Sequence, residues 1–298
     1  MRNEFAQAVI ALKQEVDALV FLTGDLGYMA LEKVQERFGS HFINAGVAEQ
    51  NMVTVAAGLA HEGFIPLVYS ISPFVTHRPY EQVRDDVCLH KLPVKLVGNG
   101  GGFGYGIMGA THHNLEDIAI MRVLPHMRVY VPFVAEDVAP ALRMMLGDGR
   151  PNYLRLNLGA KVPMPVPDFA PWRCLQKGHK GVVIGVGPVL EQVLQLPAEI
   201  IAGYSVWVTS VLPLETLPEA LVDDIAVSGT VITIEEHQGQ CGMHEALASQ
   251  LLQQQMPVTR YIPLYVKGYL SGRYGSQRWH LEENGLAGSQ LLEVFRAL

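Results

Sequence analysis

Short apolar runs alternate with helix-like segments along the first half of the chain, and this alternation restricts the possible folds more than any other feature. The runs occupy residues 18–22, 42–44, 65–70, 94–97, 128–131 and 152–156. Apolar runs of this length, separated by segments with helical periodicity, predict βαβ units with parallel strands. A parallel sheet is buried by helices on both faces. We therefore expect a doubly wound α/β domain over residues 1–160.

A proline-rich stretch divides the chain. The sequence KVPMPVPDFAPW at residues 161–172 contains four prolines, and proline fits neither the interior of a helix nor a central strand. We interpret residues 161–175 as an interdomain linker. A second α/β pattern follows, with expected strands at residues 181–185, 204–208, 229–235 and 258–263 and an expected helix at 244–254. Residues 176–298 are therefore predicted to form a second, smaller doubly wound domain.

The composition argues against several classes of partner. The 298 residues carry a formal net charge of −7 without a cluster of lysine or arginine, so neither nucleic acid nor a membrane is expected as a partner. Cys88, Cys174 and Cys241 lie far apart, which favours neither a disulfide framework nor a zinc site, and we expect no metal ligands in this chain. The sequence shows no signal peptide and no apolar run of about 20 residues. These features are typical of a cytoplasmic enzyme.

Two glycine patterns are similar to nucleotide-binding loops but lack the context that these loops need. Gly104-Tyr-Gly106-Ile-Met-Gly109 opens no immediate helix and has no acidic residue about 20 positions later. Gly185-Val-Gly187 has no third glycine. We therefore do not expect a dinucleotide site.

Glu49, His112 and Arg155 are candidate functional residues, each with a structural alternative. Glu49 begins an expected helix, where the helix dipole alone would also stabilise a carboxylate. His112 and His113 are adjacent, so on an extended backbone they point to opposite sides and do not suit one metal ion. A capping or surface role is equally open for a histidine at this place. Arg155 lies in an apolar strand and needs a partner if it is buried, either a phosphate or a carboxylate.

Several ordered motifs together resemble the C-terminal half of transketolase, which contains the pyrimidine-binding domain and the C-terminal domain. They are Thr23-Gly-Asp-Leu, Asn44-Ala-Gly-Val-Ala-Glu49-Gln-Asn-Met52, Arg78-Pro-Tyr-Glu-Gln-Val-Arg84, Ala110-Thr-His112, Leu115-Glu-Asp-Ile-Ala-Ile-Met-Arg122, Tyr153-Leu-Arg155 and Glu235-Glu-His237. Lys91-Leu-Pro-Val94 is also similar to 1-deoxyxylulose-phosphate synthase. The resemblance spans almost the whole chain and implies an enzyme that uses thiamine diphosphate.

The resemblance implies three cofactor-binding residues. Glu49 corresponds to the glutamate that hydrogen-bonds the aminopyrimidine ring nitrogen, and a buried carboxyl group at this place can exchange a proton near neutrality. Phe74 resembles the aromatic residue that stacks on the same ring. Asp25 follows Gly24 in a pattern similar to the magnesium-diphosphate signature of thiamine enzymes, in which Leu26 replaces the last glycine. Asp25 is therefore a weaker cofactor-binding candidate than Glu49.

The resemblance also implies a set of substrate-binding residues. His112 corresponds to a histidine that contacts substrate oxygens, and we expect it to be catalytic together with Glu49. Arg155 corresponds to the arginine that binds a sugar phosphate through charge-assisted hydrogen bonds. His77, Arg78 and His113 are expected to bind substrate as well.

One departure from the family pattern concerns the substrate. Met108 stands where transketolases usually have an aspartate that touches a substrate hydroxyl. A thioether in that position removes the discrimination for the hydroxyl and leaves room for an apolar group. We expect transfer of a two-carbon ketol unit between sugar phosphates, with a deoxy or otherwise modified substrate.

The diphosphate-binding domain of transketolases has no counterpart in this sequence. We therefore expect an N-terminal partner subunit that holds the diphosphate through Mg²⁺, with thiamine diphosphate at the subunit interface of a heterotetramer of two copies of each. Two alternatives remain open. The chain could be the β subunit of a 2-oxo acid dehydrogenase first component, or a non-catalytic scaffold subunit.

Overall fold

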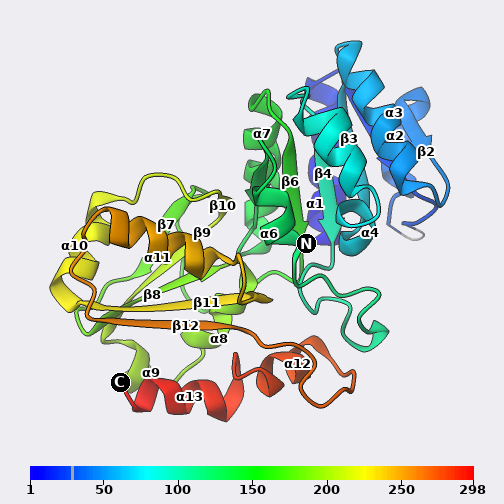
Figure 1. Cartoon of the computed structure of the whole chain (residues 1–298). Helices are drawn as coiled ribbons and strands as arrows, with labels where there is room; N and C mark the ends of the chain where they lie inside the picture. Colours follow the sequence, from blue (N-terminus) through cyan, green and yellow to red (C-terminus); the bar gives the residue numbers. More distant parts are fainter. Residues whose placement is uncertain (28–29) are drawn as a thin grey trace.

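The computed structural model describes residues 1–27 and 30–298, which form two α/β lobes (Figure 1). The sheet of the first lobe has the strand order β10-β5-β6-β4-β3-β1-β2. Its strands are β1 (Leu19–Thr23), β2 (Phe42–Asn44), β3 (Ile65–Ile71), β4 (Lys95–Asn99), β5 (Arg128–Tyr130), β6 (Asn152–Leu156) and β10 (Val211–Leu212). Neighbouring strands are parallel except β10, which runs antiparallel to β5. The expected parallel sheet is confirmed.

Helices cover both faces of this first sheet. The helices of the lobe are α1 (Arg2–Glu15), α2 (Glu32–Phe38), η1 (Gly39–His41), α3 (Glu49–His61), α4 (Ser72–Thr76), α5 (Tyr80–Gln82), η2 (Val83–Cys88), η3 (Gly106–Met108), α6 (Asp117–Arg122), η4 (Ala135–Asp137) and α7 (Val138–Gly147). Leu19 and Phe21 of β1 pack with α1, α2 and α7, whereas Val20 and Leu22 pack with α3, η2 and α6. Because successive strand residues point to opposite faces, these are the two layers of a doubly wound domain.

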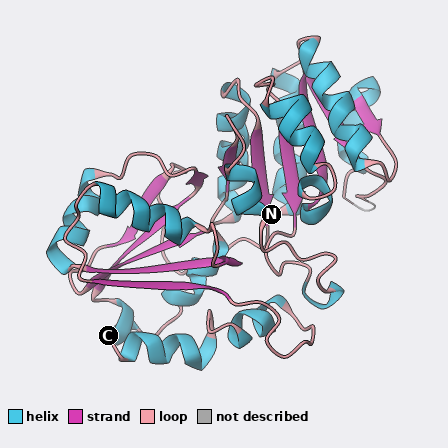
Figure 2. Cartoon of the chain, viewed as in Figure 1, coloured by secondary structure: helices cyan, strands magenta, loops and turns pink. Residues whose placement is uncertain are grey.

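The second lobe repeats the architecture around a smaller sheet, with the strand order β12-β11-β8-β9-β7. Its strands are β7 (Trp172–Gln176), β8 (Gly181–Val186), β9 (Tyr204–Thr209), β11 (Thr230–Gln238) and β12 (Arg260–Val266). β7 is antiparallel to β9, and the other pairs are parallel. Figure 2 shows both sheets between layers of helices. The mixed α/β class with two mostly parallel sheets agrees with the expectation.

The helices of the second lobe form two groups. They are η5 (Pro188–Leu190), α8 (Glu191–Leu194), α9 (Ala198–Ile201), α10 (Glu219–Ser228), α11 (Met243–Gln253), α12 (Gln277–Glu283) and α13 (Gly288–Arg296). Leu221 of α10 and Leu247 of α11 join the same apolar cluster as α3 and α6 of the first lobe. Leu281 of α12 and Phe295 of α13 pack on the other face of the second sheet. One apolar core is therefore continuous from the first lobe into the second.

The lobes are tied together near the expected linker. Strand β7 begins at Trp172, so the last residues of the stretch that we interpreted as a linker form part of the second sheet. Arg173 of β7 donates to both carboxylate oxygens of Asp137 in the first lobe, each at 2.7 Å, and both side chains are buried. Strand β10 comes from the second half of the chain but pairs with β5 at the edge of the first sheet. We retain the division into residues 1–160, 161–175 and 176–298 as a proposal.

In the part of the chain that the structure describes, no helix has the length and apolar character needed to cross a membrane.

Candidate active site

The carboxyl ends of β1 and β2 shape the loop that leads to Glu49. The side-chain oxygen of Asn44 accepts hydrogen bonds from the backbone N–H groups of Asp25, at 2.9 Å, and Gly46, at 3.0 Å. Gly46 has a φ of +68°, a conformation that favours glycine. Helix α3 begins three residues later with Glu49. The motif therefore fixes Glu49 at a helix start beside the sheet edge, with the exposed Asp25 across the loop.

Glu49 lies in an arrangement with Arg78 and Phe74. Although Glu49 is only 6% exposed, its Oε1 accepts a hydrogen bond of 2.7 Å from Nη1 of Arg78. The guanidinium carbon of Arg78 lies 3.7 Å from the centre of the Phe74 ring. A cavity of about 430 Å³ opens here, lined by Val47, Ala48, Glu49, Gln50, Asn51 and Arg78. At the edge of the cavity, the guanidinium of Arg78 thus contacts both the buried carboxylate of Glu49 and the ring of Phe74.

His112 also packs against Phe74. The two rings have an edge-to-face arrangement with centroids 5.4 Å apart, and the ring of Tyr105 lies 5.8 Å from that of His112. The hydroxyl of Tyr105 accepts a hydrogen bond of 2.9 Å from the side chain of Asn99 at the end of β4. His112 is half-buried. The structure therefore brings Glu49, Arg78, Phe74 and His112 together.

His77 is near this group but faces solvent. Its Nε2 lies 4.0 Å from a carboxylate oxygen of Glu116, and its Nδ1 lies 3.0 Å from the hydroxyl of Thr76. The side chain is exposed at the end of α4. His77 is thus available to an incoming ligand, and its expected role in substrate binding remains a proposal.

His113 lies in the contact between the lobes. Its Nε2 lies 2.6 Å from the carbonyl oxygen of Gly106 and its Nδ1 lies 2.9 Å from the hydroxyl of Tyr269. The side chain is buried, and burial lowers the pKa of His113. The ring also lies edge-on to His280, with centroids 5.0 Å apart. These contacts support a structural role for His113, and the substrate contact that the sequence predicts stays a prediction.

Arg155 is buried in an ion pair. The side chain is 2% exposed, and its Nε donates to Oδ2 of Asp117 at 2.8 Å. Its Nη2 donates to the carbonyl oxygens of Asn114, at 3.2 Å, and Glu236, at 2.9 Å. Of the two partners that the sequence left open, the structure supplies the carboxylate. The burial of Arg155 supports a structural role, and the sugar-phosphate contact that the sequence predicts stays a prediction.

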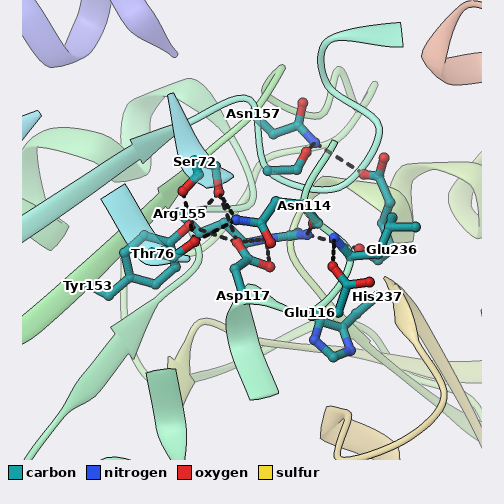
Figure 3. Close-up of polar contacts among 12 residues, drawn as sticks. Ser72, Thr76, Asn114, Glu116, Asp117, Tyr153, Arg155, Asn157, Glu236 and His237 are labelled. Atoms are coloured by element: carbon teal, nitrogen blue, oxygen red, sulfur yellow. Dashed lines mark hydrogen bonds and ion pairs between the residues drawn. The ribbon is translucent and has the colours of Figure 1, made fainter. Parts of the chain in front are cut away.

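The residues around Arg155 hold α4 and the His112 loop in place (Figure 3). The side-chain amide of Asn114 donates to the hydroxyls of Ser72 and Thr76, each at 2.8 Å. The hydroxyl of Tyr153 donates to Asp117 at 2.7 Å. Ser72 and Thr76 begin and end α4, which carries Phe74, and Asn114 follows His112 by two residues. This network therefore fixes the relative positions of Phe74 and His112.

Sequence reasoning missed the structural roles of Asp117 and Asn114. Asp117 belongs to the motif Leu115-Glu-Asp-Ile, and its position directly before an apolar helix was the available signal. Its burial inside a hydrogen-bonded network depends on residues from strand β6 and helix α4, far away in the sequence. Asn114 gave no local signal.

Glu236 joins the lobes next to this network. Its carboxylate accepts hydrogen bonds from the backbone N–H of Phe103, at 2.8 Å, and from the side chains of Asn157 and Gln277. Burial raises the pKa of Glu236. The neighbouring His237 accepts a hydrogen bond of 3.2 Å from the backbone N–H of Ala119 at the start of α6. Glu236 and His237 thus hold the second lobe against the loop and helix that flank the site.

The arrangement around Glu49 fits an aminopyrimidine ring. The guanidinium of Arg78 is planar, donates to Glu49 and stacks on Phe74, which are the contacts that a flat heterocycle with a protonated ring nitrogen would make. Glu49 would therefore hydrogen-bond the ring, and Phe74 would stack on it. Among residues 1–27 and 30–298, no three His, Cys, Asp or Glu side chains are grouped to hold a metal ion.

Known proteins share this fold and this site region. A family model described as "Transketolase, pyrimidine binding domain" matches residues 1–160. The chain is 27% identical to one of the subunits of the apulose-4-phosphate transketolase of Actinobacillus succinogenes, over 97% of this chain and 95% of that protein. It is 30% identical to the 6-deoxy-6-sulfo-D-fructose transketolase subunit SqwH of a Clostridium species, over 99% of this chain and 92% of that protein.

The structural comparison agrees with the sequence matches. A solved structure titled "Split gene transketolase, inactive beta4 tetramer" superposes with a TM-score of 0.83 at 28% identity, covering 99% of this chain and 96% of that one. The match extends over both lobes, and a pyrimidine-binding domain implies thiamine diphosphate in the family. The chain belongs to the transketolase family, and over nearly its whole length it is similar to proteins that are named as transketolase subunits.

Proposed function

We propose that this chain is the C-terminal subunit of a two-subunit transketolase that moves a two-carbon ketol unit between sugar phosphates. Two relatives that it matches over nearly their whole length are named as transketolase subunits. The proposal rests on the buried carboxylate of Glu49, which lines a cavity. The guanidinium of Arg78 contacts both this carboxylate and the ring of Phe74. A shielded carboxyl group beside an aromatic face is the arrangement that a pyrimidine-binding site requires.

Each residue of the site has a distinct task in this proposal. Thiamine diphosphate, when bound, supplies the electron sink that allows a carbon–carbon bond of a ketose to break. Glu49 shares a proton with the ring nitrogen, and Phe74 fixes the plane of the ring. His112, half-buried against Phe74, hydrogen-bonds the oxygens of the substrate. Asp25 lies across the loop that precedes Glu49 and contacts the cofactor near this edge of the sheet.

The partner subunit completes the site. Because relatives of nearly the same length are named as transketolase subunits, we assign the diphosphate and its Mg²⁺ to an N-terminal transketolase-like subunit. We propose a heterotetramer with two copies of each subunit, because pairing of pyrimidine and diphosphate domains then forms two equivalent sites. Cys88, Cys174 and Cys241 are all free thiols, which supports a cytoplasmic location.

Two exposed apolar side chains lie close in sequence to His112, the proposed substrate-binding residue. Met108 is 53% exposed and Ile107 is 77% exposed, and both lie on η3, only a few residues before His112. The ring of Tyr274 in the second lobe packs so closely on Gly109 that it would collide with a side chain at this position. Two relatives are named for apulose-4-phosphate and 6-deoxy-6-sulfo-D-fructose. These observations support a modified or deoxy sugar as substrate.

The decisive experiment is reconstitution with the N-terminal partner. The co-expressed pair, supplied with thiamine diphosphate and Mg²⁺, should transfer a two-carbon unit from a ketose phosphate, or a sulfonated or deoxy ketose, to an aldose phosphate. A pair that instead consumes a 2-oxo acid and needs a lipoyl acceptor would be a dehydrogenase component, contrary to the proposal. Full turnover by a pair that carries Glu49→Gln would indicate a scaffold subunit.

A further inference from the structure

Arg78 lies where the cofactor ring has to enter. Its guanidinium both donates to Oε1 of Glu49 at 2.7 Å and covers the ring of Phe74 at 3.7 Å. The carboxylate and the aromatic face are the two groups that the proposed function assigns to the aminopyrimidine. We call this pair of contacts the closed arrangement. One side chain of the chain itself therefore satisfies both contacts before any ligand arrives.

The contacts of Arg78 in the closed arrangement can be broken at low energetic cost. The side chain of Arg78 is 45% exposed, whereas that of Glu49 is 7% exposed. An ion pair with a half-exposed arginine is weakened by solvent and is readily broken. The cation over Phe74 adds a modest further attraction. Because Arg78 borders the cavity, its long side chain can swing out into solvent while Glu49 stays fixed at the start of α3.

We propose that Arg78 is a displaceable occupant of the ring site, which keeps Glu49 paired in the free chain and leaves when the cofactor enters with the partner subunit. This inference rests on the proposed function. It gives Arg78 a task that differs from the substrate contact expected from the sequence.

The energetic consequence is a lowered apparent affinity. A ligand that needs the open form binds in proportion to the fraction of molecules in that form. If the open form makes up about a tenth of the free chain, removal of the guanidinium raises the affinity of the ring site about tenfold. Glu49 and Phe74 remain available in such a variant, so the gain appears as tighter binding without a new contact.

The test uses the full chain without its partner and a ring fragment without a diphosphate. The probe is 4-amino-5-hydroxymethyl-2-methylpyrimidine, and binding is followed by NMR line broadening or calorimetry. Arg78→Met should bind the probe about tenfold more tightly than the parent, and adding Phe74→Ala should remove the gain. Arg84→Met is the matched control, because Arg84 is an exposed arginine paired with Asp85, and its affinity should equal that of the parent. Equal or weaker binding by Arg78→Met would overturn the inference.

A second variant separates an effect on the site from an effect on folding. Arg78→Gln keeps a polar side chain at this exposed position and should show the same direction of change, with an unchanged circular dichroism spectrum. If the reconstituted pair binds thiamine diphosphate and turns over while neither Arg78 variant gains affinity, only the closed arrangement is wrong. If the pair binds no thiamine diphosphate with any variant, the proposed function itself fails.

Discussion

Nε of Arg155 lies 2.8 Å from Oδ2 of Asp117, and both side chains are buried from solvent. This ion pair is connected to the candidate active site by hydrogen bonds. Asp117 also accepts a hydrogen bond from Tyr153, and Asn114 connects the same network to both ends of α4. The positions of Phe74 and His112 therefore depend on residues that do not face the cavity. Arg155 and Asp117 therefore help to fix the positions of the site residues.

Removing one partner of this pair should be costly. Asp117→Asn removes the carboxylate that is paired directly with the buried guanidinium of Arg155, so the free energy of unfolding should fall by about 3–5 kcal/mol. Urea denaturation measures this loss. Glu282→Gln is the control, since it removes an exposed ion pair with Arg278 and should change stability by no more than about 1 kcal/mol. A loss for Asp117→Asn as small as that of the control would mean that the pair does not support the fold.

The two adjacent histidines should respond differently to the same substitution. His112→Asn should lower kcat/KM of the reconstituted pair roughly 10- to 100-fold, the effect of a lost hydrogen bond to a substrate oxygen, and should leave the affinity for thiamine diphosphate unchanged. His113→Asn should chiefly lower thermal stability, because His113 is buried between Gly106 and Tyr269. Steady-state kinetics and thermal unfolding of both variants check this. If the effects were reversed, the assignment of the two rings would be wrong.

The contact between the lobes should weaken in acid. Burial lowers the pKa of His113 and of His280 below the ordinary value of 6.5. As the pH falls below that value, the unfolded chain takes up protons that the folded chain resists, so the stability is lost toward lower pH. Tyr269 and His280 contact the ring of His113, the charges of His280 and His112 further lower its pKa, and no described carboxylate hydrogen-bonds this ring.

His113→Gln tests this acid sensitivity. Between about pH 7.5 and pH 5.5, the parent should lose more free energy of unfolding than the variant, because the variant has one fewer group that protonates on unfolding. Urea denaturation at the two pH values gives the difference. His126→Gln, at a position outside the described contacts of His113 and His280, should keep the acid sensitivity of the parent. Identical pH dependence of parent and His113→Gln would contradict the prediction.

Met108 should influence which sugar reacts. Met108→Asp places a hydrogen-bonding group on the exposed face of η3, so the preference for a substrate with a hydroxyl at the matching carbon should rise about tenfold relative to its deoxy analogue. The ratio of the two kcat/KM values measures the preference. Ile107→Asp is the neighbouring control. An unchanged ratio would show that Met108 does not contact the substrate.

Much of the fold follows from local sequence patterns. The apolar runs that become β1, β3, β4 and β6 are largely buried on both faces, and such runs need no distant information to be recognised. Strand β10 has only two residues and pairs with β5 across the chain, so no periodicity could reveal it. The proline-rich stretch that we interpret as a linker has no helix or strand at residues 161–171, but Trp172 already belongs to β7 because it pairs with β9.

The candidate site was less predictable, because side-chain partners are tertiary. From the sequence, either a phosphate or a carboxylate could be the partner of Arg155. The carboxylate of Asp117 is the partner in the structure, and it comes from α6 rather than from the strand that carries Arg155. The alternation of His112 and His113 predicted that they would diverge, but not that His113 would be the buried one. No pattern indicated that Arg78 would reach Glu49, since the contact depends on how the end of α4 approaches the start of α3.

The central claim is that Glu49 acts on a cofactor whose diphosphate is held by another subunit. The most direct measurement is the rate of deuterium exchange at the reactive carbon of thiamine diphosphate, followed by NMR for the parent pair, the pair with Glu49→Gln, and each subunit alone. Glu62→Gln, at the other end of α3, is the matched control. We predict fast exchange for the parent and the control pair, exchange slower by roughly 10²- to 10⁴-fold for Glu49→Gln, and no acceleration by either subunit alone. Fast exchange in the Glu49→Gln pair, or in the isolated chain, would contradict the account.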